Sequence, residues 1–144
     1  MDRKNIRQYL SSAQTHSKHT STSTQSRSNN SSEYVLALET LIKDQKIYLD
    51  SSLTLERVAD QLKLSPSYLS RIINSELNTS FPDYLNSFRV EEAKSYLLNP
   101  DFSNYTITAI GLEAGFNSRS SFYEVFKKAT GTTPFVYKKE MRVR

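Results

Sequence analysis

A pattern of apolar residues occurs twice in this 144-residue chain, and this internal repeat constrains the fold more than any other feature. The segment LERVADQLKLSPSYLSRIINSELNTSFPDY aligns with ITAIGLEAGFNSRSSFYEVFKKATGTTPFVY when the second copy is given one extra residue. Such self-similarity in a short chain indicates that one supersecondary unit is used twice. The aligned pairs are Leu55 with Ile107, Val58 with Ile110, Ala59 with Gly111, Leu62 with Ala114, Leu64 with Phe116, Leu69 with Phe122, Ile72 with Val125, Ile73 with Phe126 and Tyr84 with Tyr137.

Each copy has the pattern of a helix-turn-helix, at about 54–75 in the first copy and about 106–130 in the second. Two helices that cross at a steep angle need a small residue where they approach, and Ala59 and Gly111 lie there. The turn favours a residue that tolerates positive φ, which is Gly115 in the second copy and Lys63 in the first. We expect Lys63 to cost about 1 kcal/mol relative to glycine at this position.

Polar caps and prolines mark where the helices begin. A serine or threonine cap followed by proline is a sound helix start, because the N–H that proline lacks would be unpaired there. Gly131 and Pro134 belong to the turn and the helix start that follow the second copy. The predicted caps are Thr54, Ser65, Ser80, Thr106 and Thr133.

A long helix is predicted between the two copies, at about 81–98. At ~1.5 Å per residue it spans about 27 Å, which is long enough to hold the copies apart. Another helix begins near Glu33, where Tyr34, Leu38 and Leu41 recur at helical spacing. We therefore predict an all-α fold of about seven helices over residues 33–144, in which a long linker helix joins two helix-turn-helix subdomains.

Arg89 falls in the middle of an apolar face of the linker helix, beside Leu85 and Ala93. An unpaired buried guanidinium is costly, so it needs a carboxylate or backbone carbonyls as acceptors. We expect a structural role for Arg89, with Glu56 or Asp60 as candidate partners.

The first 32 residues differ in composition from the rest. Of the 22 residues from Ser11 to Ser32, 13 are serine or threonine and the only apolar residue is Ala13. Because such a segment cannot bury enough surface to offset its ordering entropy, we expect a disordered tail or linker over residues 1–32. His16 and His19 lie in it and are expected to be solvated rather than to bind a metal.

The net charge of +4 is unevenly distributed. Residues 33–117 carry 7 basic and 12 acidic residues, whereas 118–144 carry 7 basic and 2 acidic residues. A local basic surface of this kind suits contact with phosphates, and a solvated C-terminal helix with lysines is the alternative.

Several classes of function are disfavoured. The chain has no cysteine, and residues 33–144 contain no histidine, so no Ser/His/Asp or Cys/His arrangement can form there. Its three glycines are spaced for turns and do not make a phosphate-binding loop. No apolar run is long enough for a membrane helix. We predict a non-enzymatic protein of the reducing cytoplasm, with no metal, cofactor or small-molecule site.

From about Glu33 to Arg142 the sequence resembles the DNA-binding domain of AraC/XylS-type bacterial transcription regulators. The resemblance rests on LTLERVADQLKLSPSYLSRIIN, on FPDYLNSFRVEEAKSYL and above all on ITAIGLEAGFNSRSSFYEVFKKATGTTPFVYKK. Three positions depart from the family pattern: Gly111 replaces the usual alanine, Lys138 stands where arginine is usual, and Glu124 stands where a basic residue is common.

The resemblance implies that the second helix of each copy enters a DNA major groove. Helical-wheel positions then indicate which side chains face the bases, and Arg71 is the strongest candidate because its planar fork can donate twice to guanine. The expected base-reading residues are Ser67, Ser70, Arg71, Asn74, Arg119, Ser120, Ser121 and Glu124. The expected phosphate contacts are Ser65, Thr106, Ser118, Lys127 and Lys128, with Asn74 as a further candidate.

Together these features predict sequence-specific binding to double-stranded DNA by a monomer, and a role in bacterial transcription regulation. RNA polymerase is a further candidate partner. A sensor or effector domain, which such regulators usually carry, is not visible in this chain; the chain is then a fragment or the cytosolic part of a longer, membrane-anchored regulator. The competing hypothesis is a helical module that binds another protein of a signalling system.

Overall fold

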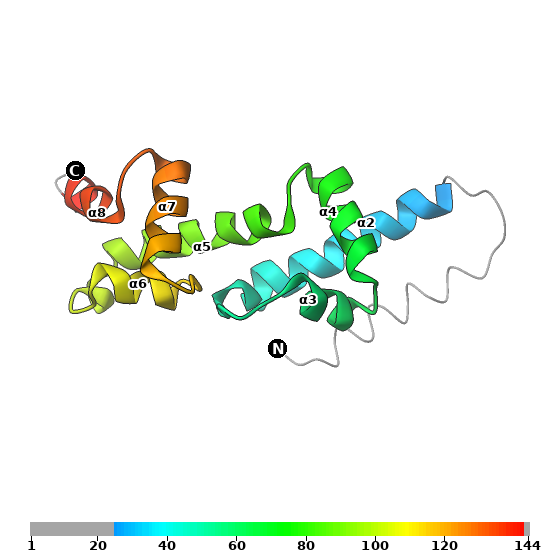
Figure 1. Ribbon diagram of the computed structural model, residues 1–144, viewed down its shortest axis with the longest axis horizontal. Helices are drawn as coiled ribbons and strands as arrows, with labels where there is room; N and C mark the ends of the chain where they lie inside the picture. The colour runs from blue at the N-terminus through cyan, green and yellow to red at the C-terminus, as the bar shows by residue number, and fades with distance from the viewer. Residues whose placement is uncertain (1–24, 143–144) are drawn as a thin grey trace. The chain divides into compact units, whose positions relative to one another are not determined.

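The computed structural model describes residues 25–142, and within this range all regular secondary structure is helical (Figure 1). This confirms the predicted all-α fold. The seven α-helices of this range are α2 (Gln25–Glu39), α3 (Leu55–Leu62), α4 (Pro66–Leu77), α5 (Phe81–Leu98), α6 (Ile107–Glu113), α7 (Arg119–Thr130) and α8 (Pro134–Arg142). Helix α2 runs on into a π-helical turn at Thr40–Asp44, and 3-10 turns occur at Ile47–Leu49 and Pro100–Phe102.

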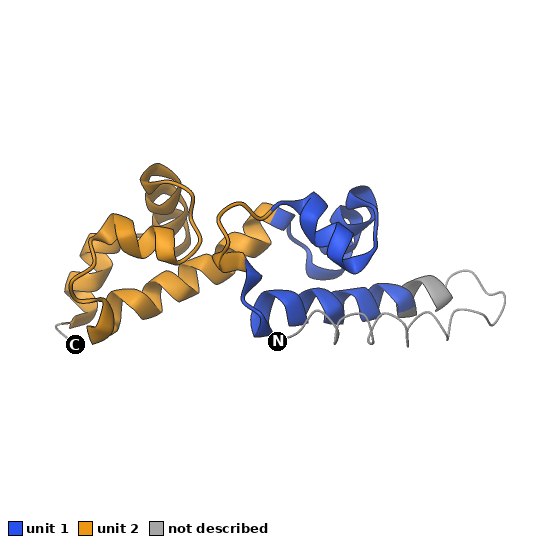
Figure 2. Ribbon diagram, turned by 90° about the horizontal axis from the view of Figure 1, so that it is seen from below, with its two compact units in different colours: residues 1–47, 54–81 blue, residues 48–53, 82–144 orange. Residues whose placement is uncertain are grey.

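The described chain forms two compact units, each with one copy of the repeat (Figure 2). Unit 1 ends its first segment at Ile47 and resumes over Thr54–Phe81, so it holds α2, α3 and α4. Unit 2 combines Tyr48–Leu53 with the chain from Pro82 onward, and it holds α6, α7, α8 and nearly all of α5.

Unit 1 is built on a core of aliphatic side chains from three helices that pack on one another, α2, α3 and α4. At the edge of this core the rings of Tyr34 and Tyr68 meet edge to face, with centroids 6.0 Å apart. The core thereby fixes α4 and leaves its opposite side uncovered by unit 1. The fully buried residues are Leu38, Leu41, Ile42, Val58, Ala59, Leu69 and Ile73.

The core of unit 2 combines aliphatic side chains with a group of aromatic rings. The rings of Phe116 and Phe122 lie 5.1 Å apart, and Phe126 contacts both Phe122 at 5.7 Å and Tyr137 at 5.4 Å. These rings tie α7 and α8 to α5 and α6 through the remaining core residues. The buried residues of this cluster are Val90, Ala93, Leu97, Ile110, Ala114, Phe116, Phe122 and Phe126.

The turn of the helix-turn-helix has the same geometry in both copies. The N–H of Leu64 donates to the carbonyl of Ala59 at 2.9 Å, and the N–H of Phe116 donates to that of Gly111 at 3.1 Å. Lys63 has a φ of 58° and Gly115 a φ of 104°, so both copies place a left-handed residue where the sequence predicts one. The repeat is therefore a repeat of structure as well as of sequence.

Most predicted caps are confirmed by side-chain oxygens that accept helix N–H groups. Thr54 accepts from Arg57 at 3.2 Å, and Thr133 accepts from Val136 at 3.2 Å. Pro66 and Pro134 take the first position of α4 and α8, as expected from their missing N–H. Local signals thus set most of the helix starts.

One boundary prediction is wrong. Order was expected to begin near Glu33, but α2 begins at Gln25, so residues 25–32 are helical rather than disordered. Extending a helix that is already nucleated adds one hydrogen bond per residue, which weak helix formers such as serine and asparagine still permit. The rest of the predicted disordered segment, residues 1–24 with His16 and His19, lies outside the described residues.

The αL conformation of Lys63 yields a stability prediction. Lys63→Gly removes the clash between Cβ and backbone and should raise the free energy of unfolding by about 1 kcal/mol. Lys63→Ala keeps the Cβ and should give no such gain. Urea denaturation of the three proteins measures this, and equal gains from glycine and alanine would contradict the backbone explanation.

Gly111 generates a second prediction, because a Cβ built there would lie against Cδ2, Cγ and Cε2 of Phe122. Gly111→Ala should lower the free energy of unfolding by about 1–3 kcal/mol through overpacking of the unit 2 core. In a Phe122→Leu background the same change should be less costly, since the ring is gone. A double-mutant cycle in urea would refute this account if the two changes were additive.

Candidate nucleic-acid interface

Helix α4 presents three polar side chains on its exposed side. Ser67, Arg71 and Asn74 are spaced i, i+4 and i+7, so they share one face, and all three are exposed. Ser70 is half-buried at the edge of this face, while Leu69 and Ile73 lie in the core behind it. The predicted base-reading residues of the first copy are thus gathered on one surface of unit 1.

Within this face, Asn74 and Arg71 differ in how they are held. The Nδ2 group of Asn74 donates to the carbonyl of Ser70 at 2.9 Å, so its amide is engaged by its own helix. Among the residues that the structure describes, no hydrogen bond or ion pair involves the Arg71 guanidinium, and its five N–H donors face solvent. Arg71 is therefore the side chain of α4 that is best placed to bind an external acceptor.

Helix α7 presents the corresponding face in unit 2. Ser120, Glu124 and Lys127 follow the same i, i+4, i+7 spacing and are exposed, with Lys128 exposed beside them. Ser121 is half-buried. The two faces differ in charge, because Glu124 occupies the position that Arg71 holds in the first copy.

Arg119 does not join this face. Its guanidinium lies 4.7 Å from the centroid of the Tyr123 ring, four residues along the same helix. A cation over an aromatic face is worth about 0.5–1 kcal/mol at an exposed site, so this contact is readily exchanged for another acceptor. As the structure stands, Arg119 lies on the Tyr123 flank of α7, apart from Ser120 and Glu124.

Three of the predicted phosphate contacts are helix caps. Ser65 accepts from the N–H of Tyr68 at 3.2 Å, Thr106 from Ala109 at 3.0 Å and Ser118 from Ser121 at 3.1 Å, by their side-chain oxygens. Each hydroxyl hydrogen is still able to donate, and the first N–H groups of a helix favour an anion. The caps of α4 and α7 thus lie at the starts of the two exposed faces.

The residues predicted to be structural lie at turns and packing contacts. Ala59 and Gly111 are buried where the two helices of each copy pack, and Pro134 is buried at the start of α8. Gly131 ends α7 with a φ of 81°, and its N–H donates to the carbonyl of Lys127 at 2.7 Å.

The acceptors predicted for Arg89 are not the ones observed. Its Nε donates to the carbonyl of Tyr48 at 2.7 Å and its Nη2 to the carbonyl of Asp50 at 3.0 Å. Backbone oxygens of a neighbouring segment, rather than the carboxylates of Glu56 or Asp60, therefore hold the guanidinium. No local signal in the sequence points to that segment.

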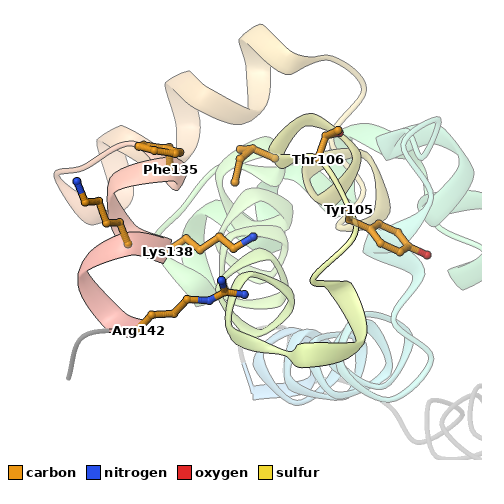
Figure 3. A pocket seen from close by; sticks show the side chains of 7 residues that line it. Tyr105, Thr106, Phe135, Lys138 and Arg142 are labelled. Carbon is orange, nitrogen blue, oxygen red and sulfur yellow. The ribbon is translucent and has the colours of Figure 1, made fainter.

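A basic hollow next to α6 was missed by sequence reasoning. Lys138, Lys139 and Arg142 of α8 line a cavity of about 520 Å³, together with Tyr105, Thr106, Ile107 and Phe135 (Figure 3). Thr106, a predicted phosphate contact, lies on its rim. The local basic excess of residues 118–144 is the signal that would have pointed to these three cations.

Helices α4 and α7 each follow a tight turn after a shorter helix, which defines a double helix-turn-helix domain. Comparison with known proteins gives the same class of domain. A family model described as a helix-turn-helix domain matches residues 58–140. The chain belongs to the AraC-type helix-turn-helix family, whose members are DNA-binding transcription regulators. The comparisons give no support to the competing hypothesis of a protein-binding module.

Two relatives illustrate how far the similarity reaches. The chain is 34% identical over 93 residues to YtdP, an uncharacterized HTH-type transcriptional regulator of Bacillus subtilis. The matched segment covers 65% of this chain and 12% of that protein. It is 33% identical over 90 residues to the melibiose operon regulatory protein of Escherichia coli, covering 62% of this chain and 29% of that protein. The chain thus spans a minor part of the length of these relatives.

Solved structures show the same fold. The C-terminal domain of AraT, a response regulator from Geobacillus stearothermophilus, is 40% identical with a TM-score of 0.60, over 67% of this chain and 77% of that one. The DNA-binding domain of AdpA, solved in complex with a target DNA, has a TM-score of 0.64 over 77% of this chain and 92% of that one. At 21% identity the latter supports the fold alone.

None of the helices in residues 25–142 combines the length and apolarity that crossing a bilayer requires. The same residues contain no group of three or more acidic, histidine or cysteine side chains that is arranged to hold a metal ion.

Proposed function

We propose that this chain binds double-stranded DNA sequence-specifically as a monomer, with α4 and α7 in two successive major grooves, and that it thereby regulates transcription in a bacterium. The observation that carries the proposal is the duplicated exposed face, Ser67–Arg71–Asn74 on α4 and Ser120–Glu124–Lys127 on α7. A helix presented in this way fits the width of the B-DNA major groove.

In this proposal the exposed side chains divide into two groups. Arg71 donates two hydrogen bonds to guanine O6 and N7, and Glu124 accepts from a cytosine amino group. The caps Ser65, Thr106 and Ser118, together with Lys127 and Lys128, contact phosphates and set the register. Lys138, Lys139 and Arg142 in the hollow beside Thr106 extend the phosphate-binding surface of unit 2.

Because the two faces differ, the proposed target is asymmetric. It consists of two unlike sequence elements about ten base pairs apart, since successive major grooves are roughly 34 Å apart on one side of the duplex. Where the protein holds its helices at another separation, the DNA bends to meet them, at a cost of order 1–6 kcal/mol. Such a site needs no palindrome.

The proposal extends to the setting of the protein. We place it in the cytoplasm with no catalytic activity, where RNA polymerase is the second macromolecular partner and a sensor or effector domain supplies the signal. The relatives support a further sensor or effector domain, because the matched segment makes up 12% of YtdP and 29% of the melibiose operon regulatory protein.

The test is selection of bound sites from a random duplex library, followed by affinity measurements at two salt concentrations. We expect one asymmetric site with two elements about a helical turn apart, and binding that weakens steeply with salt as counterions are released. A helical module for another protein would enrich no sequence and would show little affinity at either salt concentration. That result would exclude DNA binding.

Arg71 provides a test of base reading. Arg71→Ala should cost about 1–3 kcal/mol on the selected site and relax the preference at one base pair, because a bidentate contact to guanine is lost. Affinities for the four base variants at each position of the site measure this. Equal losses on the selected site and on random DNA would rule out a base-reading role.

Lys128 provides the matched contrast. Lys128→Ala should weaken binding to selected and random DNA by about the same factor and reduce the salt dependence by about one counterion, as expected for a phosphate contact. Titrations on both DNAs over a range of salt concentrations measure this. A change in base preference would contradict the assignment.

A further inference from the structure

In the amino-acid sequence, a short segment of unit 2 is preceded and followed by residues of unit 1. The segment Tyr48–Leu53, called the strap below, belongs to unit 2, whereas the chain up to Ile47 and the chain from Thr54 to Phe81 belong to unit 1 (Figure 2). The backbone therefore passes from one unit to the other three times, at 47/48, 53/54 and 81/82. The strap and α5 are thus two separate covalent connections between unit 1 and unit 2.

The strap is held to α5 by its backbone. Arg89 donates from Nε to the carbonyl of Tyr48 at 2.7 Å and from Nη2 to the carbonyl of Asp50 at 3.0 Å. Burial lowers the pKa of the Arg89 guanidinium, and the nearby Asp50 carboxylate opposes that shift. Two carbonyls two residues apart match the spread of a guanidinium, which a lysine ammonium cannot span.

The side chain of Tyr48 strengthens the attachment. Its hydroxyl donates to Oε2 of Glu92 at 2.8 Å, and its ring stacks on Phe88 with centroids 5.6 Å apart. Burial, followed by the hydrogen bond to Glu92, raises the pKa of the Tyr48 hydroxyl, so it remains a donor at neutral pH. Phe88, Arg89 and Glu92 thus form one surface of α5 that binds the strap.

The turn of the second helix-turn-helix closes over the same place. A Cβ added at Gly115 would collide with the carbonyl oxygen of Tyr48 and would lie 2.9 Å from Nε of Arg89 and 3.1 Å from Cα of Leu49. The first residues of the strap, Tyr48 and Leu49, therefore lie between α5 and the Gly115 turn, both within unit 2. Any side chain at 115 would push it out.

We propose that Arg89 is a positioning residue for DNA recognition: by holding the strap against α5 and the Gly115 turn, it determines which spacing between the two DNA elements the protein accepts. The inference rests on the proposed function. While Arg89 holds the strap, the junctions at 47/48 and 53/54 attach unit 1 to unit 2 beside the junction in α5 at 81/82. A strap released from Arg89 leaves the α5 junction as the one remaining constraint between the two reading helices.

Small changes in the separation of the two DNA elements matter for binding. Adding or removing one base pair moves one element by about 3.4 Å along the duplex and rotates it by about 34°. A protein with a bound strap discriminates strongly among such spacings. A protein with a free strap tolerates several of them while still reading the same bases, because Arg89 touches none of the base-reading side chains.

The first experiment measures spacing preference directly. Duplexes that carry the two selected elements at the preferred spacing, and at spacings one and two base pairs shorter or longer, are titrated with the native protein, Arg89→Ala, Arg89→Lys and Val90→Ala. We expect the native protein to prefer one spacing by about tenfold or more, a difference of ~1.4 kcal/mol. Arg89→Ala should reduce that preference severalfold, with Arg89→Lys between the two.

Val90→Ala is the matched control. Val90 is the next residue of α5, is 2% exposed and belongs to the unit 2 core, so its truncation destabilises unit 2 while the side chain that holds the strap carbonyls is kept. It should leave the spacing preference unchanged even where it lowers overall affinity. Equal loss of preference in Arg89→Ala and Val90→Ala would overturn the proposal, since general loosening would then explain both.

The second experiment needs no DNA. The chain has no cysteine, so Gln61→Cys on α3 and Ala129→Cys on α7, both exposed, accept one spin label each. Pulsed electron paramagnetic resonance then gives the distribution of distances between the labels. We expect a broader distribution in Arg89→Ala than in the native background or in Val90→Ala, and an unchanged width would overturn the proposal.

The two experiments separate the possible failures. A native protein that selects no pair of elements disproves the two-groove function, while the label distances still test the role of Arg89. A native protein that selects paired elements, together with an Arg89→Ala variant that keeps the same spacing preference, disproves the positioning role alone. Where Arg89→Ala does not fold, Arg89→Lys and Tyr48→Phe must give partial loss of preference for the proposal to stand.

Discussion

The arrangement of unit 2 depends on a partly buried guanidinium. Arg89 lies half-buried on α5, where an unsatisfied charge would cost several kcal/mol, and two carbonyls of the strap satisfy it. The same carbonyl of Tyr48 excludes a Cβ at Gly115, so the turn of the second helix-turn-helix is shaped by the strap as well as by its own φ. One cluster therefore joins a connecting segment, the linker helix and the second helix-turn-helix.

The two exposed faces follow from how each copy buries its apolar residues. In α4 the core takes Leu69 and Ile73, and in α7 it takes Phe122 and Phe126, which leaves the i, i+4, i+7 faces to polar side chains. The copies use different core chemistry: Ala59 permits the close approach in unit 1, whereas Phe122 fills the space over Gly111 in unit 2. Family members usually carry alanine there, so this departure is compensated by a ring packed against bare backbone.

Features of the fold were predictable from the sequence where the interactions that set them lie within a few residues of one another. Caps, prolines and apolar spacing lie within a few residues of the features they set, and they placed α3 to α8 and the left-handed turn at Lys63. The start of α2 at Gln25 was missed, because helix extension depends on a nucleus further along the chain. The partners of Arg89 lie 41 and 39 residues away, and no pattern in the sequence marks a carbonyl as an acceptor.

The candidate site shows the same division. Helical spacing placed Ser67, Arg71 and Asn74 on one face, whereas the position of Arg119 over the Tyr123 ring, in the first turn of α7, depends on a side-chain contact that the spacing does not indicate. The contrast between Arg71 and Glu124 was visible from the alignment of the repeats. A carboxylate on α7 amid the basic residues 118–144 repels phosphates, so in the proposed complex Glu124 contributes favourably only where it accepts from a base-pair donor. Under that proposal Glu124 adds selectivity to the second face, while the surrounding cations add affinity.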